Sequence, residues 1–460
     1  MLPEEARDCL ERTAIGDDVP FILDDAGAYD PNLNRFFRAC ATMGVRSAHS
    51  LKAYARDLVT WMRFLSEHRA GRSIWQGDRE DIAAYHATRR RSQPCHRISA
   101  ASWNRSVAAL EKFYNWALEE GLVAQSPFKH GTTWRRTSGG RLVATRVNRG
   151  YERAARHGDM RFVDLEGYRQ FRDVGLRGLA SDGNESVDWR GRHGERNALF
   201  AELLVTTGLR LSEAASLLLI ELPQGQEALG RATKRSIPYR VAAATAKGNK
   251  AREVLLPLRL LRRLADYAEL ERANILVRRA SKFASADTDA MHMIAYDSGA
   301  VTIADGKRET RIRLDLLSPA DRQRLVYADT GAPALLWLAE NGRPMTTAAW
   351  ETVFCRGRVR CNAAGLDLAV TPHALRHTFA VHLLSMLIRA QIGSVLRDRR
   401  DDAGAAAYRR MIGDPLQKLQ RLLGHASIAN TYIYLDSLEE SRSLVEAAAE
   451  RWSDEMESLS

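Results

Sequence analysis

Residues 371–384 read TPHALRHTFAVHLL, a stretch that predicts the start of a helix with two cationic side chains on its first turns. Thr371 suits the N-cap position, and Pro372 suits the first helical position because no N–H is needed there. A spacing of three residues places His373 and Arg376 on the same face of the helix. The start of a helix already attracts anions, so an imidazole and a guanidinium beside it predict a phosphate-binding pocket.

A second arginine lies upstream, in residues 206–213, which read TTGLRLSE. Arg210 follows a Thr-Thr-Gly turn and precedes an apolar helix, and its planar fork matches two phosphate oxygens better than a lysine would. Glu213, three residues later, is predicted to orient neighbouring groups of the site without direct chemistry. An isolated Arg-x-x-Glu is more often a structural ion pair. The presence of the other motifs in the same chain favours the functional interpretation.

A histidine and a tyrosine are the last candidate site residues in chain order. His425 follows a Leu-Gly turn, and Tyr434 lies nine residues beyond it. A phenol has an ordinary pKa of about 10 and is a weak nucleophile, so Tyr434 would need a base and a polarised phosphate. Tyr432 is the rival nucleophile, but a helical residue two positions away faces another side. We expect His377 to point elsewhere and to serve packing or a structural hydrogen bond.

A lysine stands between the two arginine motifs, in residues 246–257, which read AKGNKAREVLLP. The Gly-Asn pair and the apolar run after it predict a β-hairpin with Lys247 near its tip. An alkoxide leaves badly unless it is protonated, and a lysine can supply that proton. Lys250 is the competing candidate, and a pair of plain DNA-contacting lysines is the alternative.

In this order, the residues closely resemble the catalytic motifs of the tyrosine recombinases, also called the phage integrase family. The resemblance implies that Tyr434 attacks DNA and forms a 3′-phosphotyrosine with a free 5′-hydroxyl, without ATP, a metal or another cofactor. It implies that Arg210 and Arg376 clamp the phosphate and that His425 bonds one of its oxygens. We therefore expect a site-specific DNA recombinase or integrase.

The same resemblance implies that Lys247 protonates the departing 5′ oxygen and that His373 assists the tyrosine as a base or hydrogen-bond partner. Two details depart from the family pattern: Ala246 replaces a glycine, and Leu435-Asp436 stands where Thr-His is common. The residues themselves show no clustered carboxylates of the two-metal nuclease kind and no Gly-x-x-x-x-Gly-Lys-Ser/Thr phosphate loop.

The N-terminal half predicts a small helical domain over residues 47–128, after an extension of residues 1–46. Leu51, Tyr54, Leu58, Trp61 and Leu65 recur at steps of three and four, which indicates one apolar helix face. A second helix is expected from about 102 to 120. The segment looks like the SAM-like core-binding domain with which tyrosine recombinases clamp DNA.

Residues 129–161 combine glycine with dense arginine and predict a basic linker. Basic groups that cross a phosphate backbone gain affinity by counterion release, although a solvated basic face is the plain alternative. The candidate DNA-contacting residues of the helical domain and the linker are Lys52, Arg56, Arg89, Arg90, Arg91, Arg105, Arg135, Arg136, Arg141 and Arg146.

The catalytic domain is expected over residues 162–460, with insertions near 282–331 and 388–414. The expected fold is mainly α with a small β-sheet (α+β). By the family's example, the tail after Tyr434, with Leu444, Val445 and residues 447–449, docks on a neighbouring subunit.

The composition agrees with a nucleic-acid partner. Lys plus Arg outnumber Asp plus Glu by 68 to 57, which gives a net charge of +11. Five cysteines without a Cys-x-x-Cys spacing, and no long apolar stretch, predict a cytoplasmic protein with reduced thiols and no membrane span.

We expect double-stranded DNA with specific sites, a homotetramer on paired sites, and accessory DNA-bending or directionality proteins as partners. A mobile element or phage is the expected source. The alternatives are a type IB topoisomerase-like enzyme and a catalytically inactive DNA-binding regulator with the same fold. The family's His-x-x-Arg form weighs against the topoisomerase, and the complete set of candidate residues weighs against the regulator.

Overall fold

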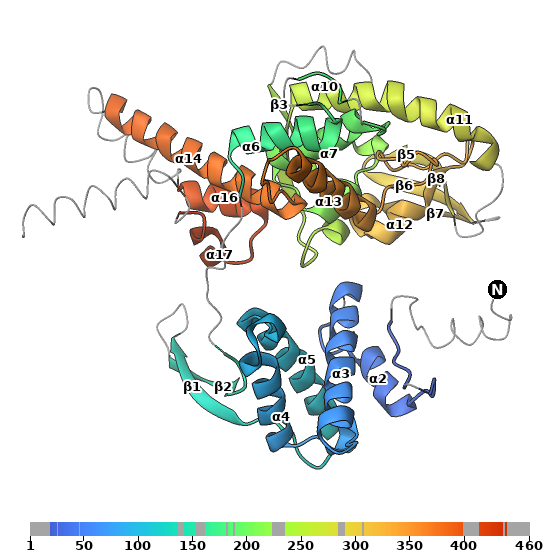
Figure 1. Cartoon of the computed structure of the whole chain (residues 1–460). Helices are drawn as coiled ribbons and strands as arrows, with labels where there is room; N and C mark the ends of the chain where they lie inside the picture. Colours follow the sequence, from blue (N-terminus) through green and yellow to red (C-terminus); the bar gives the residue numbers. More distant parts are fainter. Residues whose placement is uncertain are drawn as a thin grey trace, which may run out of the picture. The chain divides into compact units, whose positions relative to one another are not determined.

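The computed structural model divides into two compact units, Met1–Gly158 and Asp159–Ser460, which are described separately (Figure 1). Among the described residues, no helix is long and apolar enough to cross a membrane. The structure describes residues 19–24, 26–45, 47–136, 142–152, 162–180, 183–186, 189–222, 235–283, 290–305, 308–398, 414–435 and 438.

The first unit is a helical bundle with one hairpin. Its elements are α2 (Pro31–Ala39), α3 (Ala48–His68), α4 (Arg79–His86) with its π-helical extension η2 (Ala87–Arg91), α5 (Ala100–Glu119), β1 (His130–Arg136) and β2 (Leu142–Asn148), with short 3-10 turns η1 (Ile74–Gln76) and η3 (Pro94–His96). The predicted stripe on α3 is confirmed, since Leu58, Trp61 and Leu65 are fully buried. Trp61 Nε1 donates to the hydroxyl of Tyr114 on α5 at 2.9 Å, so the two long helices share one core.

Residues 19–24 and 26–45 are part of this bundle, so their assignment to an N-terminal extension is wrong. Phe36 and Phe37 on α2 are buried, and the Phe36 ring meets that of Phe113 edge to face at 5.3 Å. Asn34 Nδ2 donates to the carbonyl of Ile22 at 2.9 Å and fastens the preceding strand-like segment. Adjacent phenylalanines on a short helix require a covering partner, and α5 supplies it.

The linker prediction is also wrong over most of its length, because β1 and β2 form an antiparallel hairpin that pairs His130 with Asn148 and Arg136 with Leu142. β2 has Val143, Thr145 and Val147 at every second position, and β1 has Thr132 and Thr133, a strand signal that the dense arginines obscured. The Trp103 indole N–H donates to the carbonyl of Gly150 at 2.8 Å and holds the chain that leaves the hairpin against α5. Residues 153–161 lie outside the described residues.

The second unit is mainly helical. Its helices are α6 (Leu165–Gln170), η4 (Phe171–Arg177), α7 (Gly194–Thr207), α8 (Leu211–Ala215), η5 (Leu219–Glu221), η6 (Ala243–Thr245), α10 (Leu258–Asp266), η7 (Tyr267–Arg272), α11 (Ala273–Phe283), η8 (Leu314–Leu316), α12 (Pro319–Arg324), α13 (Thr347–Ala363), α14 (Pro372–Asp398), α16 (Pro415–Leu423) and α17 (Ala429–Tyr432). Its strands are β3 (Ser236–Val241), β4 (Arg252–Pro257), β5 (Met291–Asp297), β6 (Ala300–Asp305), β7 (Arg308–Arg313) and β8 (Leu325–Tyr327).

Helix α7 lies at the centre of this unit and packs on α14, α10, α8 and β4. Its Phe200 stacks on Trp350 of α13 with ring centroids 3.6 Å apart, inside the largest core cluster. The fold is therefore the expected one, mainly α with small sheets, and α7 is the rigid support from which the site's loops depart.

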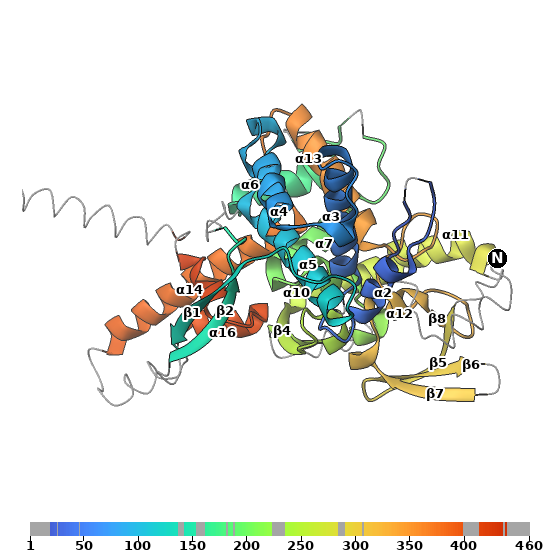
Figure 2. The same cartoon turned by 90° about the horizontal axis from the view of Figure 1, so that it is seen from below.

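The predicted insertion near 282–331 is a four-stranded sheet in the order β7-β6-β5-β8, with β8 parallel to β5 and the other pairs antiparallel (Figure 2). Val301, Ile303 and Leu325 are buried in a cluster that also contains Leu218 and Leu335, which lie outside the insertion. The predicted insertion near 388–414 begins differently, because α14 continues without a break to Asp398; residues 399–413 lie outside the described residues.

Candidate active site

The helix that opens the site begins where the sequence predicts. Thr371 Oγ1 accepts a hydrogen bond from the backbone N–H of Ala374 at 3.0 Å, and Pro372 is the first residue of α14. This cap places Arg376 one turn into the helix, where its side chain is 2% exposed. Its guanidinium donates to the carbonyls of Gly208, after α7, and Leu423, at the end of α16. Arg376 therefore joins the two turns that carry the neighbouring motifs.

Both of those turns need glycine. Gly208 has a φ of +64°, and a Cβ there would lie 2.3 Å from the ring of Phe379. Gly424 also has a φ of +64°, and a Cβ there would meet the Arg252 side chain at 2.9 Å. Left-handed backbone costs an ordinary residue roughly 1–2 kcal/mol, and the contacts would add to that. The tight turns let the carbonyls reach the arginine side chains.

Glu213 links two arginines beneath the turn. Its carboxylate accepts from Arg210 Nη1 at 2.9 Å and from the two Nη atoms of Arg252 at 2.7 and 2.6 Å. Burial opposes its ionisation, but the hydrogen bonds and charges of the arginines outweigh burial and hold the pKa of Glu213 below its ordinary value. The predicted orienting contact is present, and the carboxylate is fully charged at neutral pH.

Arg252 is a site residue that the motifs did not reveal. It begins β4, its side chain is 7% exposed, and its Nε donates to the carbonyl of Leu422 at 2.9 Å. The signal available in the sequence was its place in the alternation of β4, since Val254 and Leu256 face inward and the position two residues before them must do the same. A buried arginine on such a strand requires a carboxylate partner.

Arg210 and Arg376 lie close enough for their positive charges to interact. Arg210 Nη2 lies 3.4 Å from the carbonyl of Gly424, next to His425. Burial, with the charge of Arg210, lowers the pKa of Arg376 to about 9. A guanidinium has five N–H donors, so two carbonyl bonds leave Arg376 donors for a phosphate.

Tyr434 follows helix α17 and lies near Arg376 and Arg210. Its side chain is 1% exposed, and its hydroxyl lies 3.1 Å from Nδ1 of His377. Burial raises the pKa of Tyr434 above its ordinary value, although the charges of Arg376 and Arg210 oppose that shift. Tyr432, the rival, is 51% exposed.

His377 was expected to point elsewhere, and that expectation is wrong. Its ring lies 4.2 Å from the ring of His373, centroid to centroid, and beside the phenol of Tyr434. Positions 373 and 377 are four residues apart on α14, so they occupy one face, as Arg376 does at three. His373 itself is exposed at the first turn.

The pKa values of His373, His377 and His425 are all lowered from the ordinary value of a histidine. Burial is the main cause that lowers the pKa of His377 to about 4, and the neighbouring His373 and Arg376 add to it. Burial and the charge of Arg376 lower the pKa of His425 to about 4 as well. The pKa of His373 is lowered as well, chiefly because neighbouring atoms partly desolvate its ring although the residue is exposed, and the charge of Arg376 acts in the same direction. All three rings are therefore neutral at pH 7, and each has one nitrogen that accepts and one that donates.

His425 lies over the tyrosine. Its ring is near parallel to that of Tyr434, with centroids 6.1 Å apart, and its Nδ1 lies 3.0 Å from the hydroxyl of Thr431, which is fully buried. This contact fixes the ring and leaves Nε2 as the nitrogen available to a phosphate oxygen.

Lys247 lies in the connection between β3 and β4, as the predicted hairpin requires. Gly248 and Asn249 have φ values of +77° and +54°, which form the tight turn beside it. Lys247 and Lys250 are both exposed. The charge of Lys247 contributes to the lowered pKa of His373, although burial and two arginines contribute more. This loop therefore faces the start of α14.

The candidate DNA contacts of the first unit divide into two groups. Lys52, Arg56, Arg91 and Arg146 are exposed, Arg89 is partly buried, only the backbone is described for Arg135 and Arg136, and Arg141 lies outside the described residues. Arg90 instead donates to Glu152 at 2.9 and 2.6 Å, and Arg105 donates to Asp57 at 3.0 Å through two nitrogens. These last two arginines have structural partners inside the unit.

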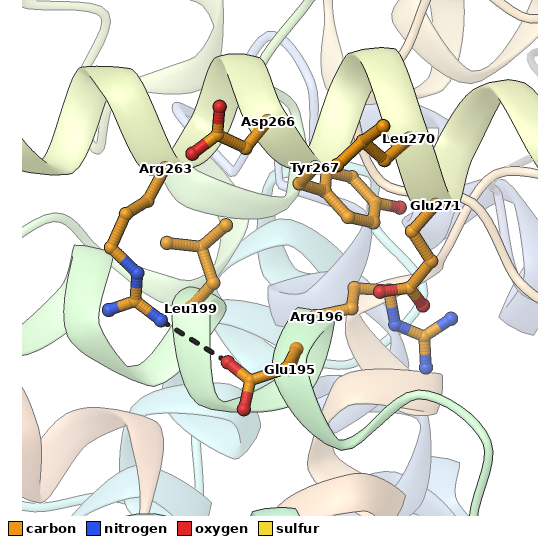
Figure 3. A pocket seen from close by; sticks show the side chains of 8 residues that line it. All are labelled: Glu195, Arg196, Leu199, Arg263, Asp266, Tyr267, Leu270 and Glu271. Carbon is orange, nitrogen blue, oxygen red and sulfur yellow. Dashed lines mark hydrogen bonds and ion pairs between the residues drawn. The ribbon is translucent and has the colours of Figure 1, made fainter.

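A hollow elsewhere in the second unit contains none of these candidate residues (Figure 3). It lies between α7 and the helix formed by α10 and η7, with Arg263 paired to Glu195 across it. Its lining consists of Glu195, Arg196, Leu199, Arg263, Asp266, Tyr267, Leu270 and Glu271.

Two family models match the chain. The model described as the phage integrase N-terminal SAM-like domain matches residues 33–121, and that of the phage integrase family matches residues 185–392. The first match begins within α2, in agreement with the packing of that helix.

Curated relatives cover most of the chain. Tyrosine recombinase XerC of Nitrobacter winogradskyi is 24% identical over 396 residues, which are 84% of this chain and 83% of the relative. Tyrosine recombinase XerD of Agrobacterium fabrum is 25% identical over 417 residues, 90% of this chain and 92% of the relative. A solved structure of the XerH site-specific recombinase bound to a palindromic difH substrate aligns with 96% of this chain and 92% of its own, at 15% identity and a TM-score of 0.47.

Proposed function

We propose that this chain, which belongs to the phage integrase family of tyrosine recombinases, is a site-specific recombinase that cuts and rejoins DNA with Tyr434 as its nucleophile. The observation that carries the assignment of the nucleophile is the contact between the Tyr434 hydroxyl and His377 Nδ1, 3.1 Å apart in space and 57 positions apart in the chain. A buried phenol beside a neutral imidazole and a buried guanidinium is an arrangement that activates a weak nucleophile.

The proposed cleavage is one transesterification. The Tyr434 oxygen attacks the phosphorus, its proton passes to His377, and the bond to the 5′ oxygen breaks as that oxygen takes a proton from Lys247. The DNA then has a 3′-phosphotyrosine on one side and a 5′-hydroxyl on the other. Rejoining reverses the step with a 5′-hydroxyl from a second strand, so the ester bond is conserved without ATP.

The remaining groups stabilise charge. Arg376 and Arg210 donate to the oxygens of the five-coordinate phosphate, and His425 donates through Nε2. These donors are held in place before DNA arrives, by the carbonyls of Gly208 and Leu423 and by Glu213, so little reorganisation is needed during the reaction. Glu213 and Arg252 position the donors and do not touch the DNA.

DNA binding must uncover the nucleophile. The side chain of Tyr434 is 1% exposed and packs with Leu419, Leu423 and Leu438. A phosphate reaches the hydroxyl only when the segment after α16 moves, so binding and cleavage are proposed to be separate steps.

The proposal extends to the assembly and its setting. By analogy with the family, the enzyme acts as a homotetramer on paired double-stranded DNA sites, with accessory DNA-bending or directionality proteins. It derives from a mobile element and acts in the cytosol, where the free thiols of the described cysteines, Cys40, Cys95, Cys355 and Cys361, stay reduced. The tail beyond residue 438, proposed to dock on a neighbouring subunit, lies outside the described residues. Topoisomerase-like relaxation and a purely regulatory role are not favoured by the relatives.

The test is a trapping assay in EDTA and without ATP. Purified protein is mixed with nicked duplexes made from the sequence that flanks its gene, and a denaturing gel reports covalent protein–DNA adducts. Wild type and Tyr432→Phe should form the adduct, and Tyr434→Phe should not. An adduct that persists in Tyr434→Phe would overturn the assignment of the nucleophile, and binding without any adduct in wild type would overturn the catalytic proposal.

The same assay separates the two histidines of α14. His377→Ala should slow adduct formation by about 10²-fold or more, the usual contribution of a general base. A stronger loss in His373→Ala than in His377→Ala would return the role of base to His373.

A further inference from the structure

We infer that the inserted sheet β5–β8 positions the loop of Lys247, and that Asp315 is the residue through which it does so. The inference rests on the proposed role of Lys247 as proton donor. It concerns a segment that the family motifs do not include and a carboxylate that is not part of the pocket. Asp315 is therefore a positioning residue, since it acts on the loop and touches neither DNA nor the reacting atoms.

The contact is made where the sheet returns to the catalytic core. Strand β7 runs directly into the 3-10 turn η8, which packs on η6, and η6 ends two residues before Lys247. Asp315, in the middle of η8, accepts from Arg240 Nη2 on β3 at 3.0 Å and from the backbone N–H of Ala243, the first residue of η6, at 3.4 Å. The carboxylate thus joins the strand before the loop to the turn that leads into it.

Asp315 is suited to this contact by its charge. The hydrogen bond from Arg240 is the main cause that lowers its pKa, and the backbone N–H of Ala243 contributes in the same direction. The side chain is 25% exposed, whereas that of Arg240 is 62% exposed. A charged acceptor that binds a backbone N–H restrains the chain itself, which a side-chain contact alone would not do.

The turn η8 is anchored on its other side by a buried arginine. Arg322 of α12 is 1% exposed and donates to both carboxylate oxygens of Glu221, at 2.7 and 2.9 Å. It also donates to the carbonyl of Leu314 in η8 at 3.1 Å and to that of Ser216 at 3.0 Å. Ser216 ends helix α8, at whose start Arg210 stands. The insertion therefore connects the support of Arg210 with the loop of Lys247.

The base of the loop is bonded, because Thr245 and Ala246 donate to the carbonyl of Ala242, whereas its tip is exposed. Residues 247–250 are exposed, two of them have left-handed backbone, and the turn is closed by a bond from Asn249 N–H to the carbonyl of Ala246 at 3.1 Å. A proton donor on such a loop spends time away from the leaving oxygen unless its base is restrained. Misplacing a catalytic group by about 1 Å can cost up to ~10²-fold in rate, so a restraint at η6 affects the protonation step.

The test compares two DNA substrates in single-turnover cleavage. One has the normal bridging 5′ oxygen, and the other has sulfur at that position, which leaves as a thiolate without a proton donor. Lys247→Ala should cleave the oxygen substrate far more slowly than wild type and the sulfur substrate at nearly the wild-type rate. Asp315→Ala should show the same selectivity with a smaller loss of about tenfold on oxygen, within the range that misplacement produces.

Controls keep the outcomes distinct. Glu309→Ala removes an exposed carboxylate of the same sheet, at the end of β7 away from η8, where Glu309 pairs with Ala304, and should cleave both substrates like wild type. Arg240→Ala removes the ion pair but leaves the bond from the Ala243 N–H to Asp315, so it should show the same selectivity for oxygen with a smaller loss than Asp315→Ala. It settles the question if Asp315→Ala folds poorly. Asp315→Asn, which keeps an acceptor, should recover part of the rate.

Two results would overturn these statements separately. If Lys247→Ala slows both substrates equally, the role of Lys247 as proton donor fails and the inference with it. If Lys247→Ala is selective for oxygen while Asp315→Ala and Arg240→Ala slow both substrates equally, or neither, the proposed function stands and the positioning role is wrong.

Discussion

Replacing Arg252 by methionine tests whether the buried carboxylate of Glu213 holds the site together. The arginine makes three hydrogen bonds, two to Glu213 at 2.7 and 2.6 Å and one to the carbonyl of Leu422 at 2.9 Å. The two charged side chains are 7% and 1% exposed. Methionine keeps an apolar stem of similar length but donates no hydrogen bond. Glu213 would then lose its principal counter-charge while remaining out of water.

The size of the effect follows from these contacts. Removing one partner of a buried ion pair costs about 3–5 kcal/mol, because the other charge is left uncompensated. Arg210 still pairs with Glu213 at 2.9 Å, so we expect the lower limit, about 3 kcal/mol of the free energy of unfolding. A double variant that also changes Glu213 to glutamine leaves no unpaired carboxylate. It should therefore lose less stability than the sum of the two single variants, with a coupling energy of ~0.5–3 kcal/mol.

Urea unfolding of the wild type, the two single variants and the double variant measures both quantities. The trapping assay adds a second readout, because the Leu422 contact positions the turn that leads to His425, and adduct formation should fall in parallel. A loss below about 1 kcal/mol in Arg252→Met, or strictly additive effects in the cycle, would refute the reasoning that Glu213 depends on this arginine.

Two further predictions concern pH and the turn after α7. The pKa of His377 and that of His425 lie at about 4 in the folded protein against 6.5 ordinarily, so the unfolded chain binds more protons between these values. The free energy of unfolding should therefore fall as the pH drops through that window, and His425→Asn should reduce the slope in urea titrations; a slope unchanged by this variant would contradict the assignment. Gly208→Ala combines a φ of +64° with a clash of its Cβ against Phe379 at 2.3 Å, whereas Gly365→Ala has a φ of +78° and nothing within 4 Å. Thermal unfolding should show a loss of about 1 kcal/mol for the Gly365 control and clearly more for Gly208→Ala; equal losses would mean that Phe379 moves aside without cost.

Features that depend on residues close together in the chain could be predicted from the sequence. The start of α14 depends on Thr371 and Pro372, and the apolar face of α3 depends on a repeat of three and four. The turn beside Lys247 depends on a Gly-Asn pair, although the connection between β3 and β4 is longer than that turn. The order of the motifs, matched to a known family, indicated the chemistry as well. The predictions failed where a segment is stabilised by distant partners. The arginines of this region suggested a linker, although residues 130–136 and 142–148 are paired as strands and Trp103 binds the carbonyl of Gly150 after them.

The sequence alone indicated the family, the fold class and the residues of the motifs, because these depend on residue type and spacing, but it did not reveal Arg252 or the contact of His377 with Tyr434. Only the tertiary structure decided which side chains meet. His377 and Tyr434 are 57 positions apart, Arg252 and Glu213 are 39 apart, and Asp315 lies 75 positions from Arg240. Periodicity within an element says which face a residue occupies, but the partner on that face comes from another element. These contacts depend on the packing of α7 against α14 and β4, and on the packing of η8, which follows the inserted sheet, against η6. No local sequence pattern encodes this packing.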